Sequence, residues 1–159
     1  RLKSVRIEET GDLDAAIAGA DILCSVTRAT TPVIRGEWIR AGTHVDLVGG
    51  YRPDMREIAD QGILSGRIFV DVLNAVLAEA GDLIQPINAG ILRPESIAGD
   101  LSALALNRAQ RQNEEEITLF KSVGTATADL AAAVAVWKLH KNIVGTTLTM
   151  APRMPLFGL

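Results

Sequence analysis

Short apolar runs alternate with helix-like segments through the first 122 residues of the chain. The apolar runs are rich in β-branched residues, which favour strands, and they lie at residues 4–8, 21–27, 43–49, 67–71 and 116–122. The segments with helical spacing lie at residues 12–20, 54–66, 72–81 and 93–108. Strands that are apolar on both faces and alternate with helices are typical of parallel βαβ units. The pattern therefore predicts an α/β fold with a parallel sheet, doubly wound if the sheet is open.

The last part of the chain has a different pattern. Residues 124–142 are alanine-rich, with Gly124 before them and cationic side chains near their end, which favours one long helix. Such a helix is too apolar to stand alone in water, so we expect it and the tail at 143–159 to dock on another part of the protein. Since the chain opens on RLKSVRIEET without a methionine, we expect it to be a piece of a longer protein.

Composition narrows the range of partners. Hydrophobic residues make up 48% of the chain, and 16 basic against 19 acidic residues give a formal net charge of -3 without any basic block. Nucleic acid is therefore not an expected partner. No run reaches the roughly 20 apolar residues that cross a bilayer. A single cysteine, Cys24, gives neither a disulfide framework nor a zinc site. These features predict a soluble protein in a reducing cytoplasm.

Three predicted strand ends carry residues suited to a ligand site. In open parallel sheets, ligands bind beyond the carboxyl ends of the strands. The three ends are the hydroxyl-rich stretch 25–32, the paired glycines Gly49 and Gly50, and Ser122 with Gly124. Glycines let another molecule approach the backbone because they lack a Cβ. Turn and capping roles explain the same residues without a ligand, so both interpretations stay open on the residues alone.

Four isolated side chains lie outside these strand ends or in the middle of predicted elements. Cys24 is interpreted as a small buried side chain, and His44 and His140 as structural residues on a strand and at a helix end. Asp46 differs, because a carboxylate in a buried strand needs hydrogen-bond donors, and a strand end beside a cofactor is one place to find them. The acidic run at 113–117 is interpreted as a solvated cap.

Three blocks of sequence, taken together, resemble the ornithine cyclodeaminase and mu-crystallin family. They read ADILCSVTRATTPVIRGEWIRAGTHVDLVGGYRPDMREI, FVDVLNAVLAEAGDL and EEITLFKSVGTATADLAAA, in the family's order. The resemblance implies a Rossmann-like domain that binds NAD or NADP, and a second domain that binds substrate and forms a homodimer. It assigns residues 1–123 to the second half of the Rossmann-like domain, without the Gly-rich loop. Residues 124–159 then form a helix and strand of the second domain.

Carried over by position, the resemblance implies which residues contact each ligand. The implied cofactor contacts lie at the three strand ends: Thr27, Val48, Gly49, Gly50 and Ser122. The implied substrate contacts are Tyr51 and Val123. The implied substrate is a small amino or imino acid, and no metal is implied.

Tyr51 separates two kinds of chemistry within the family. Cyclodeaminases read like Gly-Gly-Asp-Cys-Pro-Gly-Lys here, and the aspartate is their proposed acid/base; in this chain Tyr51 stands at the aspartate and Met55 at the lysine. A phenol, which ordinarily ionises near pH 10, is a poor general base at neutral pH. The YRPDMRE stretch resembles the reducing members more closely. The resemblance thus implies hydride transfer from NAD(P)H to a small cyclic imino acid of the pyrroline-2-carboxylate type.

Two alternatives remain open at this stage. One is ornithine cyclodeamination to proline and ammonia, with Asp54 replacing the missing carboxylate. The other is a non-catalytic, cofactor-dependent binding protein or an inactive fragment.

Overall fold

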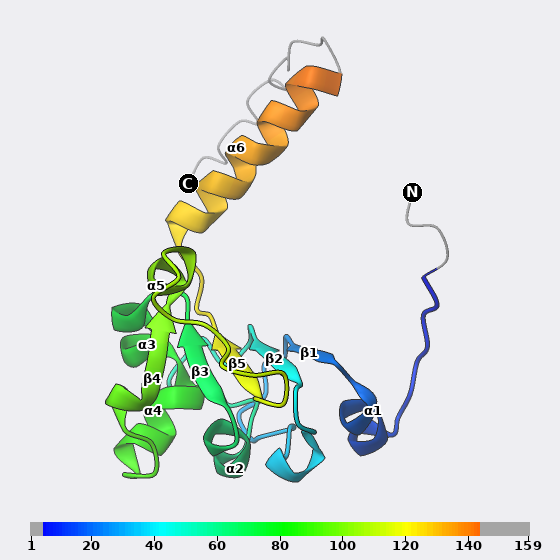
Figure 1. Cartoon of the computed structure of the whole chain (residues 1–159), viewed down its shortest axis with the longest axis vertical. Helices are drawn as coiled ribbons and strands as arrows, with labels where there is room; N and C mark the ends of the chain where they lie inside the picture. Colours follow the sequence, from blue (N-terminus) through cyan, green and yellow to red (C-terminus); the bar gives the residue numbers. More distant parts are fainter. Residues whose placement is uncertain (1–4, 144–159) are drawn as a thin grey trace, which may run out of the picture. The chain divides into compact units, whose positions relative to one another are not determined.

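The computed structural model describes residues 5–143 of the 159-residue chain. The chain divides into two compact units, Arg1–Val123 and Gly124–Leu159. The described part of the first unit is an α/β structure built on one sheet, and that of the second is helix α6 (Figure 1).

Within the described residues, the first unit contains a five-stranded sheet in the order β1-β2-β5-β3-β4. Its strands are β1 (Ile22–Ser25), β2 (His44–Leu47), β3 (Arg67–Val70), β4 (Ile97–Asp100) and β5 (Thr118–Lys121). Because β5 pairs with both β2 and β3, the last strand in sequence lies between them. Every neighbouring pair is parallel. All five carboxyl ends therefore lie at the same edge of the sheet. We call the residues that directly follow β1, β2, β3 and β5 (26–27, 48–51, 71–72 and 122–123) the carboxyl edge.

Short helices precede and connect the strands. They are α1 (Leu13–Gly19), α2 (Asp60–Leu64), α3 (Leu73–Glu79), α4 (Gly81–Asn88) and α5 (Leu101–Ala105). Two of them begin at aspartates that cap the helix amino terminus. The Asp12 carboxylate accepts a hydrogen bond from the Ala15 N–H at 3.2 Å, and the Asp100 carboxylate accepts one from the Ala103 N–H at 2.9 Å. Such caps satisfy backbone donors that the helix leaves free.

The core lies between the central strands and the helices. Val45 and Leu47 on β2 and Leu119 on β5 are fully buried, as are Ile63 on α2 and Leu83 on α4. Alternate residues of β2 are only half-buried, as expected for a strand whose side chains point to opposite faces. The hydrophobic side chains of the sheet and helices thus form one cluster.

The predicted α/β class and parallel sheet are confirmed, and four of the five predicted strands are present as β1, β2, β3 and β5. The strand predicted at residues 4–8 is wrong for the described residues 5–8. They have no strand structure, and Ile7 is 90% exposed because no neighbouring strand within the described chain pairs with it.

The helix predicted at residues 93–108 is also wrong in its first half. Ile97–Asp100 forms strand β4, and the helix that follows, α5, has five residues. Gly99 lets β4 pack closely against Ala109, since a Cβ on Gly99 would lie 2.8 Å from the Cβ of Ala109. The helix predicted at 54–66 is confirmed only over α2, because the preceding residues run as turns and extended chain.

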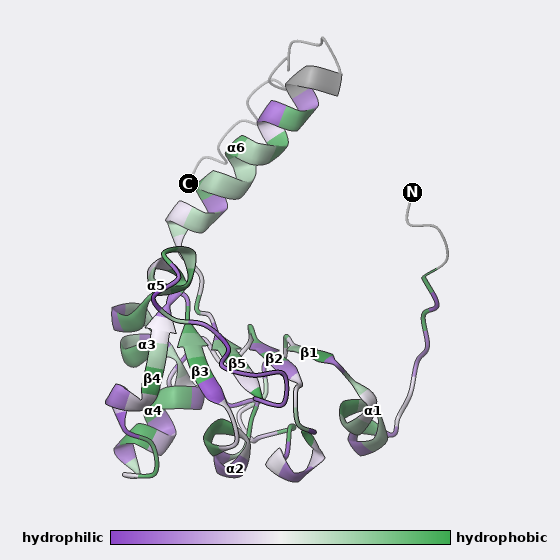
Figure 2. Ribbon diagram, in the orientation of Figure 1, coloured by the Kyte–Doolittle hydropathy of each residue, from purple (hydrophilic) through white to green (hydrophobic). Residues whose placement is uncertain are grey.

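Helix α6 (Ala126–Ile143) confirms the helix predicted near 124–142. The apolar side chains among its residues 126–140 are exposed; Leu130 is 65% exposed and Leu139 63%. The green of hydrophobic residues covers much of its length (Figure 2). Among the described residues, no helix has both the length and the apolarity to cross a membrane. The predicted tail after 143 lies outside the described residues, and the assignment of the two units to particular domains stays a prediction.

Candidate functional site

Three of the predicted strand ends lie side by side at the carboxyl edge. Ser25 of β1 pairs with Leu47 of β2, which pairs with Lys121 of β5. The Val48 N–H donates to the Ser25 carbonyl at 2.8 Å, and the Ser122 N–H donates to the Leu47 carbonyl at 3.2 Å. The structure thus brings the segments around Thr27, Gly49–Gly50 and Ser122 together, although they are distant in sequence.

A buried polar cluster underlies these segments. It consists of Ser25, Glu57, Asp82 and Lys121, all of which are less than a tenth exposed. The Nζ atom of Lys121 lies 3.3 Å from Oδ2 of Asp82. Two carboxylates and one ammonium therefore lie together in the interior, beside the Ser25 hydroxyl. Charges are rarely buried unless they are paired, so this arrangement is informative about the site.

Lys121 ties the cluster to the end of β2. Its ammonium donates to the Leu47 carbonyl at 3.0 Å and also to the Gly49 carbonyl. Lys121 thus holds the Gly49 carbonyl and is a second donor to the Leu47 carbonyl, which also accepts from the Ser122 N–H.

The carboxylates tie the cluster to the neighbouring segments. Oε1 of Glu57 accepts hydrogen bonds from the Ser25 hydroxyl at 2.7 Å and from the Thr27 N–H at 2.6 Å. Oδ1 of Asp82 accepts from the backbone N–H groups of Glu57 at 2.7 Å and Ile58 at 3.2 Å. The cluster thereby links the ends of β1, β2 and β5 to helix α4.

Burial governs the ionisation of this cluster. Loss of solvent raises the pKa of Asp82, against the effect of the neighbouring Lys121 ammonium. Loss of solvent also lowers the pKa of Lys121, against the attraction of Asp82. Both shifts favour the neutral forms, because burial outweighs the attraction across 3.3 Å. The packing of the surrounding chain therefore holds the pair together.

The paired glycines are required by the chain itself. A Cβ on Gly49 would lie 2.3 Å from the Thr27 carbonyl oxygen and 2.4 Å from Cδ of Glu57. A Cβ on Gly50, whose φ is +57°, would lie 2.2 Å from Oδ2 of Asp82. The sequence suggested that these glycines admit another molecule; in the structure the missing Cβ atoms leave space for the buried cluster.

Tyr51 and Asp54 lie at the surface beyond the glycines. Tyr51 is 44% exposed. Both oxygens of Asp54 accept hydrogen bonds from the guanidinium of Arg52, at 3.0 and 2.7 Å. The carboxylate considered as a replacement acid/base is therefore already paired, and its catalytic role stays a prediction.

A further aspartate holds the loop after β5. Asp71, which follows β3, accepts hydrogen bonds from the Val72 N–H at 2.7 Å and from the Val123 N–H at 2.9 Å. It thus positions one of the two residues expected to contact substrate.

Sequence reasoning missed Glu57, Asp71, Asp82 and Lys121. The available signal was a charged residue inside or next to an apolar run, as in LFKS and FVD. The same signal did single out Asp46, which is half-buried.

The prediction that Cys24 is buried is wrong, because β1 lies at an edge of the sheet and Cys24 is exposed. Its Sγ lies 3.7 Å from Oδ2 of Asp46, its partner in register on β2. The structural interpretation of His44 agrees with its 2.8 Å hydrogen bond to the Thr118 hydroxyl.

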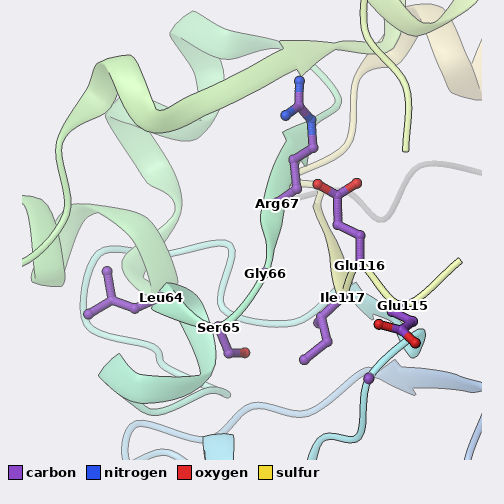
Figure 3. Close-up of a pocket in the computed structure, with 8 residues that line it drawn as sticks. Leu64, Ser65, Gly66, Arg67, Glu115, Glu116 and Ile117 are labelled. Carbon is purple, nitrogen blue, oxygen red and sulfur yellow. The ribbon is translucent and has the colours of Figure 1, made fainter. Parts of the chain in front are cut away.

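The amino-terminal edge of the sheet also has a hollow, shown in Figure 3. It lies where β3 and β5 begin, between Gly66 and Arg67 on one side and Glu115 to Ile117 on the other. This is the edge opposite to the one where parallel sheets bind ligands. Among the described residues, no group of His, Cys, Asp and Glu is arranged to hold a metal ion.

Comparison with known proteins agrees with the fold. The model of the ornithine cyclodeaminase/mu-crystallin family matches residues 1–143. A Delta(1)-pyrroline-2-carboxylate reductase of Paracoccus denitrificans is 46% identical over 123 residues, covering 77% of this chain and 39% of the relative. Ketimine reductase mu-crystallin of Mus musculus is 37% identical over 122 residues, covering 77% of this chain and 36% of the relative.

A solved structure extends the likeness to three dimensions. The Delta(1)-pyrroline-2-carboxylate reductase of Thermococcus litoralis, in complex with NADH and L-proline, has a TM-score of 0.75 and 37% identity. The match covers 85% of this chain and 42% of that structure. The chain thus spans about two fifths of the length of these relatives. On this evidence the chain belongs to the ornithine cyclodeaminase/mu-crystallin family.

Proposed function

We propose that the protein containing this chain is an NAD(P)-dependent reductase of small cyclic imino acids, with the carboxyl edge forming part of its active site. One observation carries the proposal: 46% identity to a pyrroline-2-carboxylate reductase over 123 residues. The tyrosine at position 51 adds support, because a deaminase of this family needs a carboxylate there and a hydride-transfer enzyme does not.

The chain's own atoms at the carboxyl edge suit a nicotinamide dinucleotide. Within residues 5–143, nothing accepts a hydrogen bond from the Gly50 N–H, although Gly50 is buried. A ligand acceptor would recover the free energy that such a donor loses. We propose that Thr27, Val48 and Ser122 contact the cofactor together with Gly49 and Gly50.

The remaining predicted residues would face the substrate. When bound, the dinucleotide would supply the hydride for the C=N carbon of the imino acid. We propose that Tyr51 and Val123 contact the substrate, with Val123 held in place by its hydrogen bond to Asp71.

The arrangement of the whole protein is part of the same proposal. Residues 1–123 would form the second half of the dinucleotide-binding domain, and 124–159 part of a substrate domain that forms a homodimer. The exposed apolar side chains of α6, such as Leu130 and Leu139, support this because surfaces of that kind are normally covered. We propose a cytoplasmic location on the basis of the single, free Cys24.

The test is an assay of the intact protein that contains this chain, with NADH or NADPH and pyrroline-2-carboxylate. We expect substrate-dependent oxidation of one cofactor and formation of proline. If folded protein oxidises neither cofactor with any member of a panel of cyclic ketimines, the proposal is wrong. Release of ammonia and proline from ornithine without net NADH would identify a cyclodeaminase instead. Dinucleotide binding without either reaction would identify a binding protein.

A further inference from the structure

The buried ammonium of Lys121 is not explained by the proposed reaction, which needs no lysine at this place. We infer that Lys121 is a positioning residue: paired with Asp82, it fixes the orientation of the Gly49–Gly50 peptide and thereby presents the Gly50 N–H to the dinucleotide. The inference rests on the proposed function for the identity of the ligand, but the positioning itself is a property of the chain alone.

The location of Lys121 argues that its charge has a specific use. Lys121 ends β5, the central strand, and pairs in register with Leu47 and Val70, both of which are fully buried. A buried ion pair is often no more stabilising than apolar side chains of similar volume. Stability alone therefore does not explain a lysine at this position.

The contacts of Lys121 indicate what that use is. Its ammonium donates to the carbonyls of Leu47 and Gly49, the last residue of β2 and the first of the two glycines. The described chain has no cis peptide bond, so the Gly49 carbonyl and the Gly50 N–H point in opposite directions across one planar peptide. Holding the carbonyl toward Lys121 turns the N–H away from the buried cluster.

A second contact fixes the other side of Gly50. Its carbonyl accepts a hydrogen bond from the N–H of Gly81, the first residue of α4, at 3.1 Å. Asp82 follows directly and pairs with Lys121. The Gly49–Gly50 segment is therefore held at two successive carbonyls, and only the hold by Lys121 depends on a charge.

The test compares Lys121→Met with the double variant Lys121→Met/Asp82→Asn in the intact protein. The single variant leaves buried carboxylates without their cation, so general destabilisation would confuse its interpretation. The double variant removes the Lys121–Asp82 pair and leaves Glu57 with its hydrogen bonds from the Ser25 hydroxyl and the Thr27 N–H, and we expect its thermal midpoint to recover to within about 5 °C of the wild type. A role confined to stability predicts that every other property recovers with it.

If Lys121 positions the Gly49–Gly50 peptide, the properties of this segment should not recover in the double variant. In the double variant, hydrogen exchange at the amides of residues 49–51 should remain about tenfold or more faster than in the wild type, and the Kd for NADH or NADPH should rise by a similar factor, as expected for loss of a hydrogen bond to a charged group. Wild-type exchange at these amides in a stable double variant would overturn the inference.

A matched control separates local from general effects. Thr118→Val alters a buried residue at the other end of β5, and should leave exchange at residues 49–51 unchanged even where it lowers stability. If the wild-type protein binds no dinucleotide, the proposed function fails. The exchange comparison, which needs no ligand, still decides whether Lys121 positions Gly49.

Discussion

The ammonium of Lys121 lies 3.3 Å from Oδ2 of Asp82, with both side chains excluded from solvent where β2 ends. The two residues come from a strand and a helix that meet only in the folded chain. Because burial raises the pKa of Asp82 and lowers that of Lys121, neither charge is favoured by its surroundings alone. Each charge therefore offsets part of the free-energy cost of burying the other.

Removing one partner should therefore be more harmful than removing both. We expect Lys121→Met and Asp82→Asn each to lower the free energy of unfolding by about 3–5 kcal/mol, as found for buried pairs that lose one member. The double variant should lose less than either single variant, so the coupling free energy should exceed the loss in either single variant. Urea unfolding of the four proteins measures this, and strictly additive losses would contradict it.

The loss in Lys121→Met should depend on pH. The Lys121 charge opposes the rise in the pKa of Asp82, so its removal raises that pKa further. A folded state whose carboxyl pKa exceeds the unfolded value binds more protons, so its stability increases as pH falls through the folded pKa. We expect the difference in unfolding free energy between wild type and variant to narrow from pH 8 to pH 5. A difference that is constant or widens over this range would show that Asp82 is not the group responsible.

Gly50 and Gly90 provide a matched pair for the cost of a Cβ. Both have positive φ, +57° and +71°, so alanine is strained at each. A Cβ at Gly90 meets nothing within 4 Å, whereas one at Gly50 meets Asp82 at 2.2 Å. We expect Gly90→Ala to cost about 1 kcal/mol and Gly50→Ala about 3 kcal/mol or more. Thermal unfolding compares the two variants. Equal losses would mean that Asp82 moves away from the new Cβ without a cost in free energy.

The sequence predicted the sheet where local composition was decisive. Four strands were found because runs such as THVDLVG and RIFVD are apolar and β-branched. β4 was missed because Ile97–Asp100 holds one β-branched residue and a glycine, and lies beside helix-like spacing. Pairing with β3 makes this segment a strand, and that is a tertiary effect invisible in a local window.

The sequence predicted the loops of the candidate site but not the buried cluster beneath them. Three loops were expected at one edge because parallel strands place their carboxyl ends together. The buried cluster was missed because Glu57, Asp82 and Lys121 are far apart in sequence, and a charged residue beside an apolar run, as Lys121 is in LFKS, does not show which partners it meets in the fold. The need for glycine at 49 and 50 comes from this cluster, so it could not be derived from the glycines alone.

The reactivity of Cys24 should be low for an exposed thiol. Desolvation, and then the nearby charge of Asp46, raise the pKa of Cys24. Because the thiolate is the nucleophile, a raised pKa means that the alkylation rate keeps rising with pH beyond the ordinary thiol value of about 9.0 and is low at pH 8. Asp46→Asn should lower that pKa and speed iodoacetamide labelling at pH 8 by about threefold or more. Unchanged labelling in this variant would show that Asp46 does not influence the thiol.

Substitution of Tyr51 shows whether its side chain only contacts the imino acid or also transfers a proton during the proposed reaction. Tyr51 is 44% exposed, and no residue of the described chain forms a hydrogen bond with its hydroxyl. If it only contacts the imino acid, Tyr51→Phe should keep kcat within about twofold in the reductase assay, because the ring remains.

The matched variant Tyr51→Ala removes the ring as well. We expect it to raise KM for the imino acid about tenfold with a smaller effect on kcat, since binding contributed equally to the ground and transition states is lost. A fall in kcat of about a hundredfold in Tyr51→Phe, with KM unchanged, would contradict this division. It would mean that the phenol transfers a proton during the reaction, and that the position keeps an acid/base role after the carboxylate of cyclodeaminases is replaced.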